Sequence, residues 1–301
     1  MNFLSIKKLS TLTAIVLAFV LVSCKKESSS NSATTADPVT EEQAVTYTQE
    51  STEAESGFDD VEDLAMIAGG EEEVTSEAKE GEGARLFPFV SLRLRIGTCA
   101  TITVTPNDST YPKTVTIDFG AGCPGRDGKV RKGAIILHFT GPIRKAGSVL
   151  TITLRDYYVG RVHIEGTKII SNLSENGNIK YTVQVVNGKL TLPNDRGYTY
   201  NSLRYVAQIE GGATTDVMDD IFRIEGRSET KFNNGTTITF NTDSALIKKT
   251  ICPWISKGVL KVKINTHVFS LDYGAPSNGD CDNKALLTWD NGSKQRLINL
   301  P

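Results

Sequence analysis

The sequence predicts an all-β fold, either a large antiparallel sandwich or a partly closed barrel of about 14–16 strands. Apolar and polar residues alternate in segments such as Thr114–Phe119 and Leu260–Ile264, which is the period of a strand with one buried face. Asn-Gly pairs, which favour tight hairpin turns, recur through the chain at Asn187-Gly188, Asn234-Gly235 and Asn291-Gly292. Sheets with one apolar face must bury that face against another element, so a compact β domain follows.

Charge divides the chain into two parts. Residues 85–301 carry 28 Lys and Arg against 18 Asp and Glu, whereas residues 25–84 carry 17 Asp and Glu against 3 Lys. The formal net charge of −2 therefore hides an acidic segment attached to a basic domain. We expect 85–301 to be the β-rich domain, either as one continuous domain or as two similar halves that meet near residue 195.

The acidic segment, 24–84, is predicted to be a mostly disordered linker. Low hydrophobicity together with high net charge does not offset the entropy lost on ordering. One short helix is expected at 57–68, where Phe58, Val61, Leu64 and Ala65 have helical spacing. Gly69-Gly70 is expected to end that helix.

The first 23 residues have the layout of a lipoprotein signal peptide. Lys7 and Lys8 precede Leu12–Val22, an apolar run that is too short to span a bilayer as a stable helix. The sequence Leu21-Val22-Ser23-Cys24 resembles the lipobox of bacterial lipoproteins. An ordinary cleaved signal with an unrelated cysteine nearby is the alternative.

The lipobox resemblance implies that Cys24 becomes the mature N-terminus and carries a diacylglycerol and an amide-linked acyl chain such as palmitate. Two or more acyl chains give stable membrane anchoring. No Asp directly follows Cys24, so the resemblance favours the outer membrane over retention at the inner one. The side of that membrane, periplasmic or surface-exposed, stays open.

Four further cysteines suit two disulfides in an exported chain. Three pairings are possible. A weak internal repeat favours the pairs Cys99–Cys123 and Cys252–Cys281. In this repeat, Asp118-Phe119-Gly120 precedes Cys123 and Asp272-Tyr273-Gly274 precedes Cys281. A zinc site built from the four cysteines is the competing interpretation, although no two of them are two residues apart.

Taken together, the lipobox, the acidic leader and the two Asp-aromatic-Gly motifs resemble a group of uncharacterised β-rich lipoproteins from Bacteroidota. The resemblance extends over nearly the whole chain and implies no particular activity.

A basic loop is the first candidate binding site. Its cations are Arg126, Lys129, Arg131 and Lys132. They could bind lipopolysaccharide phosphates, an acidic glycan or the acidic segment of the protein itself. The alternative is a solvated hairpin whose charges discourage edge-to-edge strand pairing.

A second candidate is a calcium site at Asp280, Asp282 and Asn283, which place oxygen ligands in one loop. The full spacing of a calcium-binding EF-hand loop is absent, and an Asx-rich turn is the alternative. The three histidines lie in strand patterns without a second histidine at ligand spacing. We therefore expect no other cofactor.

The function expected is that of a non-enzymatic envelope lipoprotein that acts as a binding or structural module. No catalytic motif appears in the sequence, and aromatic platforms for nucleic acid are not interleaved with the basic residues. The alternative is a glycan-active or glycan-binding accessory of the outer membrane, for which Trp254 and Trp289 could stack on sugars. An enzyme would need two carboxylates in one cleft with divergent pKa values. An adhesion component that uses exposed sheet edges is a third hypothesis.

Overall fold

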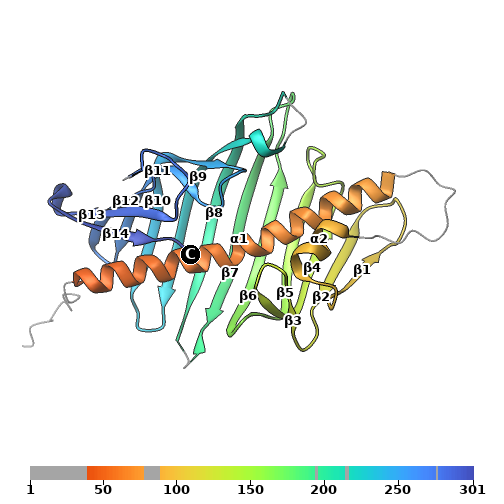
Figure 1. The fold of residues 1–301 in the computed structure, drawn as a ribbon, viewed down its shortest axis with the longest axis horizontal. Helices are drawn as coiled ribbons and strands as arrows, with labels where there is room; N and C mark the ends of the chain where they lie inside the picture. The colour runs from red at the N-terminus through yellow and green to blue at the C-terminus, as the bar shows by residue number, and fades with distance from the viewer. Residues whose placement is uncertain (1–38, 78–88, 194–195, 214–216, 276) are drawn as a thin grey trace, which may run out of the picture. The chain divides into compact units, whose positions relative to one another are not determined.

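The computed structural model describes residues 39–77, 89–193, 196–213, 217–275 and 277–301. Within these ranges the chain is mostly β, with 14 strands in one antiparallel sheet and two α-helices (Figure 1). The predicted all-β class and strand number are confirmed. The sheet is not closed on itself, since β1 and β14 stand at opposite ends of the strand order.

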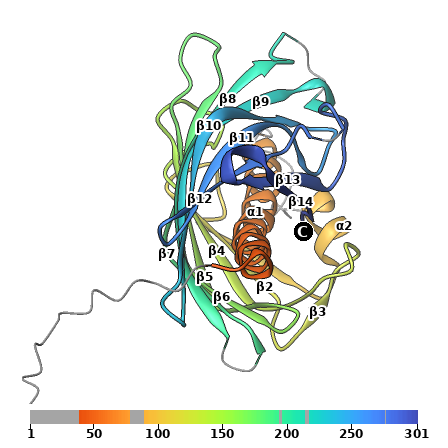
Figure 2. The same cartoon turned by 90° about the vertical axis from the view of Figure 1, so that its left-hand side faces the viewer.

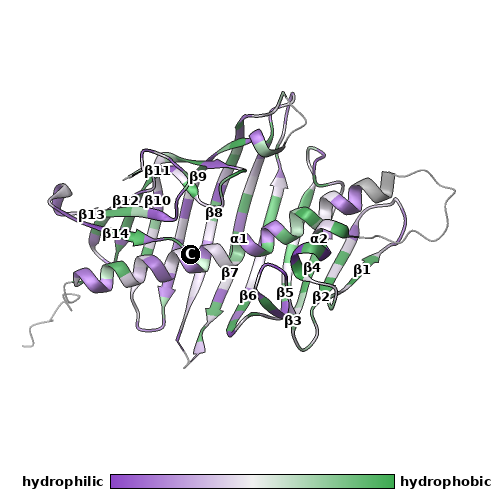
Figure 3. Cartoon of the chain, viewed as in Figure 1, coloured by the Kyte–Doolittle hydropathy of each residue, from purple (hydrophilic) through white to green (hydrophobic). Residues whose placement is uncertain are grey.

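The strands follow one another almost strictly as an up-and-down meander, and only β3 lies off the main path, where it pairs with β4. Their bounds are β1 Thr101–Thr105, β2 Lys113–Asp118, β3 Cys123–Pro124, β4 Val130–Phe139, β5 Val149–Val159, β6 Val162–Asn172, β7 Lys180–Thr191, β8 Gly197–Glu210, β9 Ile221–Phe232, β10 Thr237–Lys249, β11 Ile255–Ile264, β12 His267–Asp272, β13 Lys284–Trp289 and β14 Lys294–Asn299. The 3-10 helices are η2 (Val217–Asp219) and η3 (Asp290–Gly292). The alternation of hydropathy along the strands is visible in Figure 3.

The described residues, from Val39 to Pro301, form one compact unit. β7 and β8 pair directly on either side of residue 195, so the sheet continues through the position at which two halves could have met.

Two of the three Asn-Gly pairs lie at the predicted hairpins, between β9 and β10 and between β13 and β14. The hairpin prediction is wrong for Asn187-Gly188, which lies inside β7 at a register shift in its pairing with β8. Asn187 there has φ 53°, which is typical of a bulge residue. A Cβ at Gly188 would stand 3.0 Å from the ring of Phe58, so the bulge makes room for a helix side chain.

Register shifts of this kind occur in all seven strand pairings from β4–β5 to β10–β11. Bulges bend strands and increase their twist. At Gly133, where φ is +77°, an added Cβ would lie 2.0 Å from the Asp156 carbonyl oxygen of the next strand. Similar close approaches to neighbouring backbone occur at Gly166, Gly188, Gly226 and Gly258. These positions help the sheet to curve, and it curves around a long helix (Figure 2).

That helix, α1, spans Glu41–Glu77 and crosses the concave face of the sheet from β14 to β2 (Figure 1). Its 37 residues correspond to about 55 Å of helix at ~1.5 Å per residue, which is close to the width of a flat sheet of this many strands at ~4.8 Å spacing. The prediction of a disordered linker is wrong over these residues; 24–38 and 78–84 lie outside the described residues.

Local sequence explains where α1 begins. The Thr40 backbone N–H donates to Gln43 Oε1 at 2.9 Å, and the Gln43 backbone N–H donates to Thr40 Oγ1 at 3.2 Å. This reciprocal pair is a capping box. Glu41 and Glu42 in the first turn also complement the helix dipole.

The buried face of α1 contains the residues expected at 57–68. Phe58, Val61, Leu64 and Ala65 are all at most 1% exposed. The helix continues past Gly69-Gly70, contrary to the prediction. A Cβ at Gly69 would stand 2.8 Å from Phe139 Cε1, so this glycine allows close packing instead of ending the helix.

A second helix, α2 (Val90–Ile96), lies beside α1. Two disulfides, Cys99–Cys123 and Cys252–Cys281, close loops with sequence separations of 24 and 29 residues. These are the pairs that the internal repeat favours. Because all four cysteines are in disulfides, none of them remains for a zinc site.

Candidate functional site

Asp60 of α1 is the centre of a buried ion-pair cluster. Arg131 of β4 donates to its Oδ2 at 2.9 Å, and Lys129 and Arg95 donate to its Oδ1 at 2.8 and 3.0 Å. Asp60 is 4% exposed and Arg131 is fully buried. Burial by itself would raise the pKa of Asp60, but Arg131 and Lys129 outweigh it and hold the pKa below its usual range.

A second cluster surrounds Lys168 of β6, whose side chain is 2% exposed. Its ammonium group pairs with Glu62, lies 3.1 Å from Asp59 Oδ1 and donates to the Phe58 carbonyl oxygen at 3.0 Å. Burial opposes the charged form of Lys168, but Glu62 and Asp59 outweigh burial and raise its pKa. The lysine therefore stays charged inside the protein because the helix supplies its counter-ions.

A third contact lies near the end of α1. Glu72 is buried and pairs with Lys113 of β2, and the Tyr111 hydroxyl donates to Glu72 Oε2 at 2.6 Å. Neighbouring Glu71 accepts hydrogen bonds from the backbone N–H groups of Ser91 and Leu92 at 2.6 and 3.2 Å, so it caps α2. Acidic residues of α1 thus bind cations or N–H groups at three positions across the sheet.

These contacts locate the basic loop of the sequence analysis. Lys129 and Arg131 bind Asp60 of α1, so the protein's own acidic segment occupies them. Arg126 and Lys132 are exposed, and Lys132 Nζ stands 4.9 Å from the centre of the Tyr158 ring. The structure therefore separates the four cations into two bound by α1 and two at the surface.

Between α1 and strands β8 to β11 lies a pocket of about 400 Å³. Its α1 side carries the acids Glu55, Asp59, Asp60 and Asp63, of which Glu55, Asp59 and Asp63 recur every four residues and so share one face of the helix. Its opposite side is formed by loop and strand residues: Ile224, Leu246, Pro253, Trp254, Ile255, Tyr273, Leu300 and Pro301.

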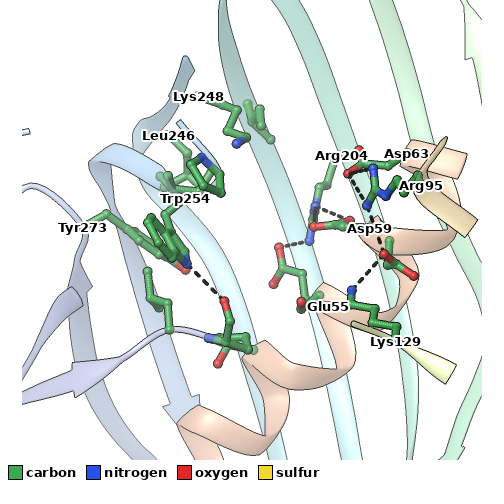
Figure 4. A pocket seen from close by; sticks show the side chains of 18 residues that line it. Glu55, Asp59, Asp63, Arg95, Lys129, Arg204, Leu246, Lys248, Trp254 and Tyr273 are labelled. Carbon is green, nitrogen blue, oxygen red and sulfur yellow. Dashed lines mark hydrogen bonds and ion pairs between the residues drawn. The ribbon is translucent and has the colours of Figure 1, made fainter. Parts of the chain in front are cut away.

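The two sides of the pocket face one another in Figure 4, with Trp254 and Tyr273 on one side and Glu55, Asp59 and Arg204 on the other. Arg204 of β8 pairs with Glu55 and lies 3.3 Å from Asp59 Oδ1. Burial raises the pKa of the Tyr273 hydroxyl to about 12, so it remains a hydrogen-bond donor at neutral pH.

The aromatic side is held by the second disulfide. Cys252, which pairs with Cys281, lies two residues before Trp254. The Trp254 indole N–H donates to the Pro301 carbonyl oxygen at 3.1 Å. The indole is therefore fixed at one edge while its ring lines the pocket.

Lys248 lies at the end of β10, between the two sides of the pocket in this view (Figure 4). Its ammonium group donates to the Cys252 carbonyl oxygen. Burial lowers the pKa of Lys248, and Asp63 and Asp59 only partly oppose that effect. No ion pair joins Lys248 to any residue in the described ranges.

The candidate calcium loop folds as a turn. The Lys284 backbone N–H donates to Asp282 Oδ1 at 2.7 Å, and the Leu300 backbone N–H donates to the Asn283 carbonyl oxygen at 2.7 Å. Asp280 is exposed. Across the described part of the chain, no group of three or more His, Cys, Asp or Glu residues is arranged to hold a metal ion.

The remaining candidates lie apart from the pocket. Trp289 packs against Phe269, with ring centres 5.9 Å apart, in a separate groove. His163 stacks on Tyr158. Cys24 and the signal segment lie outside the described residues. Sequence reasoning missed Lys248, Arg204 and Tyr273. Tyr273 belongs to the Asp272-Tyr273-Gly274 motif, whereas no local motif marks the other two.

Comparisons with protein-family models, curated proteins and solved structures find no match to this chain. None of the helices in the described residues is long and apolar enough to cross a membrane.

Proposed function

We propose that this protein is an outer-membrane lipoprotein whose folded part is a non-enzymatic binding module. The sequence Leu21-Val22-Ser23-Cys24 supports lipid attachment at Cys24. The two disulfides support export, because such bonds persist in oxidising compartments. The long helix packed into the sheet supports a rigid module, since its acids bind buried cations at several positions.

The observation that carries the binding role is the pocket between α1 and the β8–β11 side of the sheet. Ligand sites are typically concave, lined largely by apolar and aromatic groups and oriented by a few polar ones. This pocket combines Trp254 and Tyr273 with Arg204 and Lys248. A planar or ring-shaped ligand would contact the aromatic side and exchange hydrogen bonds with the charged side.

The state of the carboxylates favours binding over catalysis. Glu55, Asp59, Asp60 and Asp63 each form an ion pair with an Arg or Lys residue. A general acid has to exchange a proton with its substrate. The ion pairs of Asp60 hold its pKa below the usual range, so Asp60 is a poor proton donor at neutral pH. All four acids also hold a neighbouring cation in place, which suits a binding site.

A glycan-active enzyme is the second candidate, and one observation favours it. The pKa of Asp63 is raised, mainly by burial, while that of Asp60 in the same pocket is lowered. Divergent carboxylate pKa values mark many active sites, although ion-pair networks also produce them. If this candidate is correct, Asp63→Asn abolishes glycan hydrolysis without preventing glycan binding.

The binding role is tested with the full-length protein in detergent and a panel of neutral and acidic glycans and lipopolysaccharide, with calcium or a chelator present. We expect binding that is lost in Trp254→Ala and kept in Trp289→Phe, whose side chain lies in another groove. Loss of binding in both variants, or in neither, would place the ligand elsewhere. Dependence on calcium would implicate Asp280, Asp282 and Asn283.

Anchoring is tested separately by intact-mass analysis of the mature protein. A diacylglyceryl and acyl modification at Cys24 is expected, and Cys24→Ala should release the protein from the membrane fraction. A mature chain without acyl groups that begins at another residue would contradict the proposal.

A further inference from the structure

Among the described residues, Lys248 has no carboxylate as an ion-pair partner, unlike the other cations that line the pocket. Arg95 and Lys129 pair with Asp60, and Arg204 pairs with Glu55. Among the described residues, the Lys248 ammonium group is assigned only the Cys252 carbonyl oxygen. An ammonium group has three N–H donors, so two remain for a ligand.

The lining residues also set how much charge a ligand can carry. They include four acids, Glu55, Asp59, Asp60 and Asp63, and four bases, Arg95, Lys129, Arg204 and Lys248. The lining is therefore balanced, and three of its bases are already paired. One anionic group fits beside Lys248, whereas a ligand with several negative charges would face the acids of α1 without compensation.

Trp254 lies in the loop that the Cys252–Cys281 disulfide closes. The carbonyl oxygen that accepts a hydrogen bond from Lys248 belongs to the same loop. Cys252 forms the disulfide with Cys281, and the Cys252 carbonyl oxygen accepts a hydrogen bond from Lys248. Trp254 follows Cys252 by two residues. The Trp254 indole N–H is bound to Pro301, which leaves the ring surface for a ligand. The pocket thus places a cation and an aromatic ring on one short segment.

We infer that the pocket binds a sugar ring that carries a carboxylate, with the ring against Trp254 and the carboxylate at Lys248. This inference rests on the proposed binding role and names the ligand class for it. The hydroxyl groups of the sugar would meet the Glu55–Arg204 pair across the pocket. A fatty acid fits less well, because charged groups line that side.

The experiment uses full-length protein in detergent with Trp289→Phe as the background, so that Trp254 is the sole tryptophan. Binding is measured by Trp254 fluorescence and calorimetry. The probes are galacturonate, glucuronate and sialyllactose, each with a single carboxylate, with the methyl esters of the same sugars as uncharged counterparts. We expect at least one acid to bind and its methyl ester to bind about 10-fold more weakly or worse, which is the effect of losing one charged hydrogen bond.

Variants then assign the contact. Lys248→Met should weaken binding of the acid about 10-fold and leave binding of its ester unchanged. Lys249→Met is the matched control, because the adjacent Lys249 points to the Gly279 carbonyl oxygen instead of the pocket. Lys249→Met should bind like the parent. The ester comparison needs no variant at Lys248, so it stands even if Lys248→Met fails to fold.

Two results would overturn the inference in different ways. If esters and neutral sugars bind as tightly as acids and remain sensitive to Trp254→Ala, the binding role survives and the acidic class is wrong. If no acid, ester or neutral sugar binds by either method, and micelles of carboxylate-bearing lipopolysaccharide core do not bind either, both proposals fail. Micelles of carboxylate-bearing lipopolysaccharide core distinguish the source: binding to them alone supports a lipid-linked acidic sugar, and binding to the soluble sugars supports a free one.

Discussion

The two halves of α1 are held to the same sheet by different means. The C-terminal half, from Gly57 onward, buries Phe58, Val61 and Leu64 and pairs Asp60 with Arg131 inside the protein. The N-terminal half buries small or hydroxyl side chains instead, and its ion pairs lie nearer the solvent. Its buried residues are Ala44, Thr48, Ser51, Thr52 and Ala54.

This difference indicates which half fixes the helix. Burying a large apolar side chain contributes about 1.5–3 kcal/mol, and a small one far less. Ion pairs such as Arg296–Glu41, in which both side chains are more than one third exposed, contribute about 0–1 kcal/mol. The C-terminal half should therefore contribute most of the free energy that attaches α1 to the sheet, and the N-terminal half should contribute less.

The largest expected effect comes from Phe58→Ala. Phe58 is 1% exposed and stacks on Tyr200 at 5.6 Å between ring centres. Truncation of a buried Phe costs about 3–5 kcal/mol. Urea unfolding measures this, with Tyr47→Ala as the aromatic control in the N-terminal half. Because Tyr47 is only partly buried, Tyr47→Ala should lower the free energy of unfolding less than Phe58→Ala does. An equal loss would contradict the difference between the two halves of α1.

Asp60→Asn is expected to have the next largest effect. It removes a charge that Arg131, Lys129 and Arg95 share, and leaves a fully buried arginine with Asp127 alone. Breaking a buried ion pair costs about 3–5 kcal/mol, and Asp127 should keep the loss near the lower limit. The double variant Asp60→Asn/Arg131→Met should recover part of that loss. An additive double variant would show that the two residues are not coupled.

Lowering the pH tests the ion pairs of Asp60, with a smaller expected loss of stability than Asp60→Asn. The pKa of Asp60 lies below its ordinary value of 3.8 in the folded protein. Its contribution to stability is therefore complete above that value and is lost as the pH falls below it toward the folded pKa. Thermal unfolding between pH 5 and 3 should show a weaker pH dependence in Asp60→Asn than in the parent protein. Identical curves would rule out this contribution.

The smallest expected effect is that of Ser51→Ala. The Ser51 and Thr230 hydroxyl oxygens are 2.5 Å apart, and both side chains are buried. Loss of one neutral hydrogen bond costs about 1 kcal/mol. The double variant Ser51→Ala/Thr230→Val should be nearly as stable as the single one. A loss above ~3 kcal/mol would place a major anchor in the N-terminal half.

The period-two pattern predicted the strand number and class because each strand has one buried face. Helical spacing of Phe58, Val61, Leu64 and Ala65 also identified the anchoring part of α1. The rest of α1 was missed because Thr48 and Ser51 carry no hydrophobic signal. Its counter-ions lie far away in sequence, as with Glu72 and Lys113 or Asp60 and Arg131. The Thr40–Gln43 capping box was the one local signal that could have marked its start.

The pocket could not be predicted for a similar reason. Trp254 was considered as a sugar-stacking residue, but its neighbours come from separate elements. Lys248 is on β10, Arg204 on β8 and Glu55 on α1. Alternation shows which face of a strand a residue occupies, but not which distant residue it will meet.

Native-state hydrogen exchange of the full-length protein reports the opening free energy of each part of α1, so it tests whether the C-terminal half anchors the helix. We expect amides at 58–72 to exchange only with the central strands of the sheet, and amides at 45–54 to exchange through a smaller opening. Asp60→Asn should reduce protection first in the C-terminal half. Equal protection of both halves, or exchange throughout α1 at the rate of an unfolded chain, would contradict the conclusion that the C-terminal half anchors the helix.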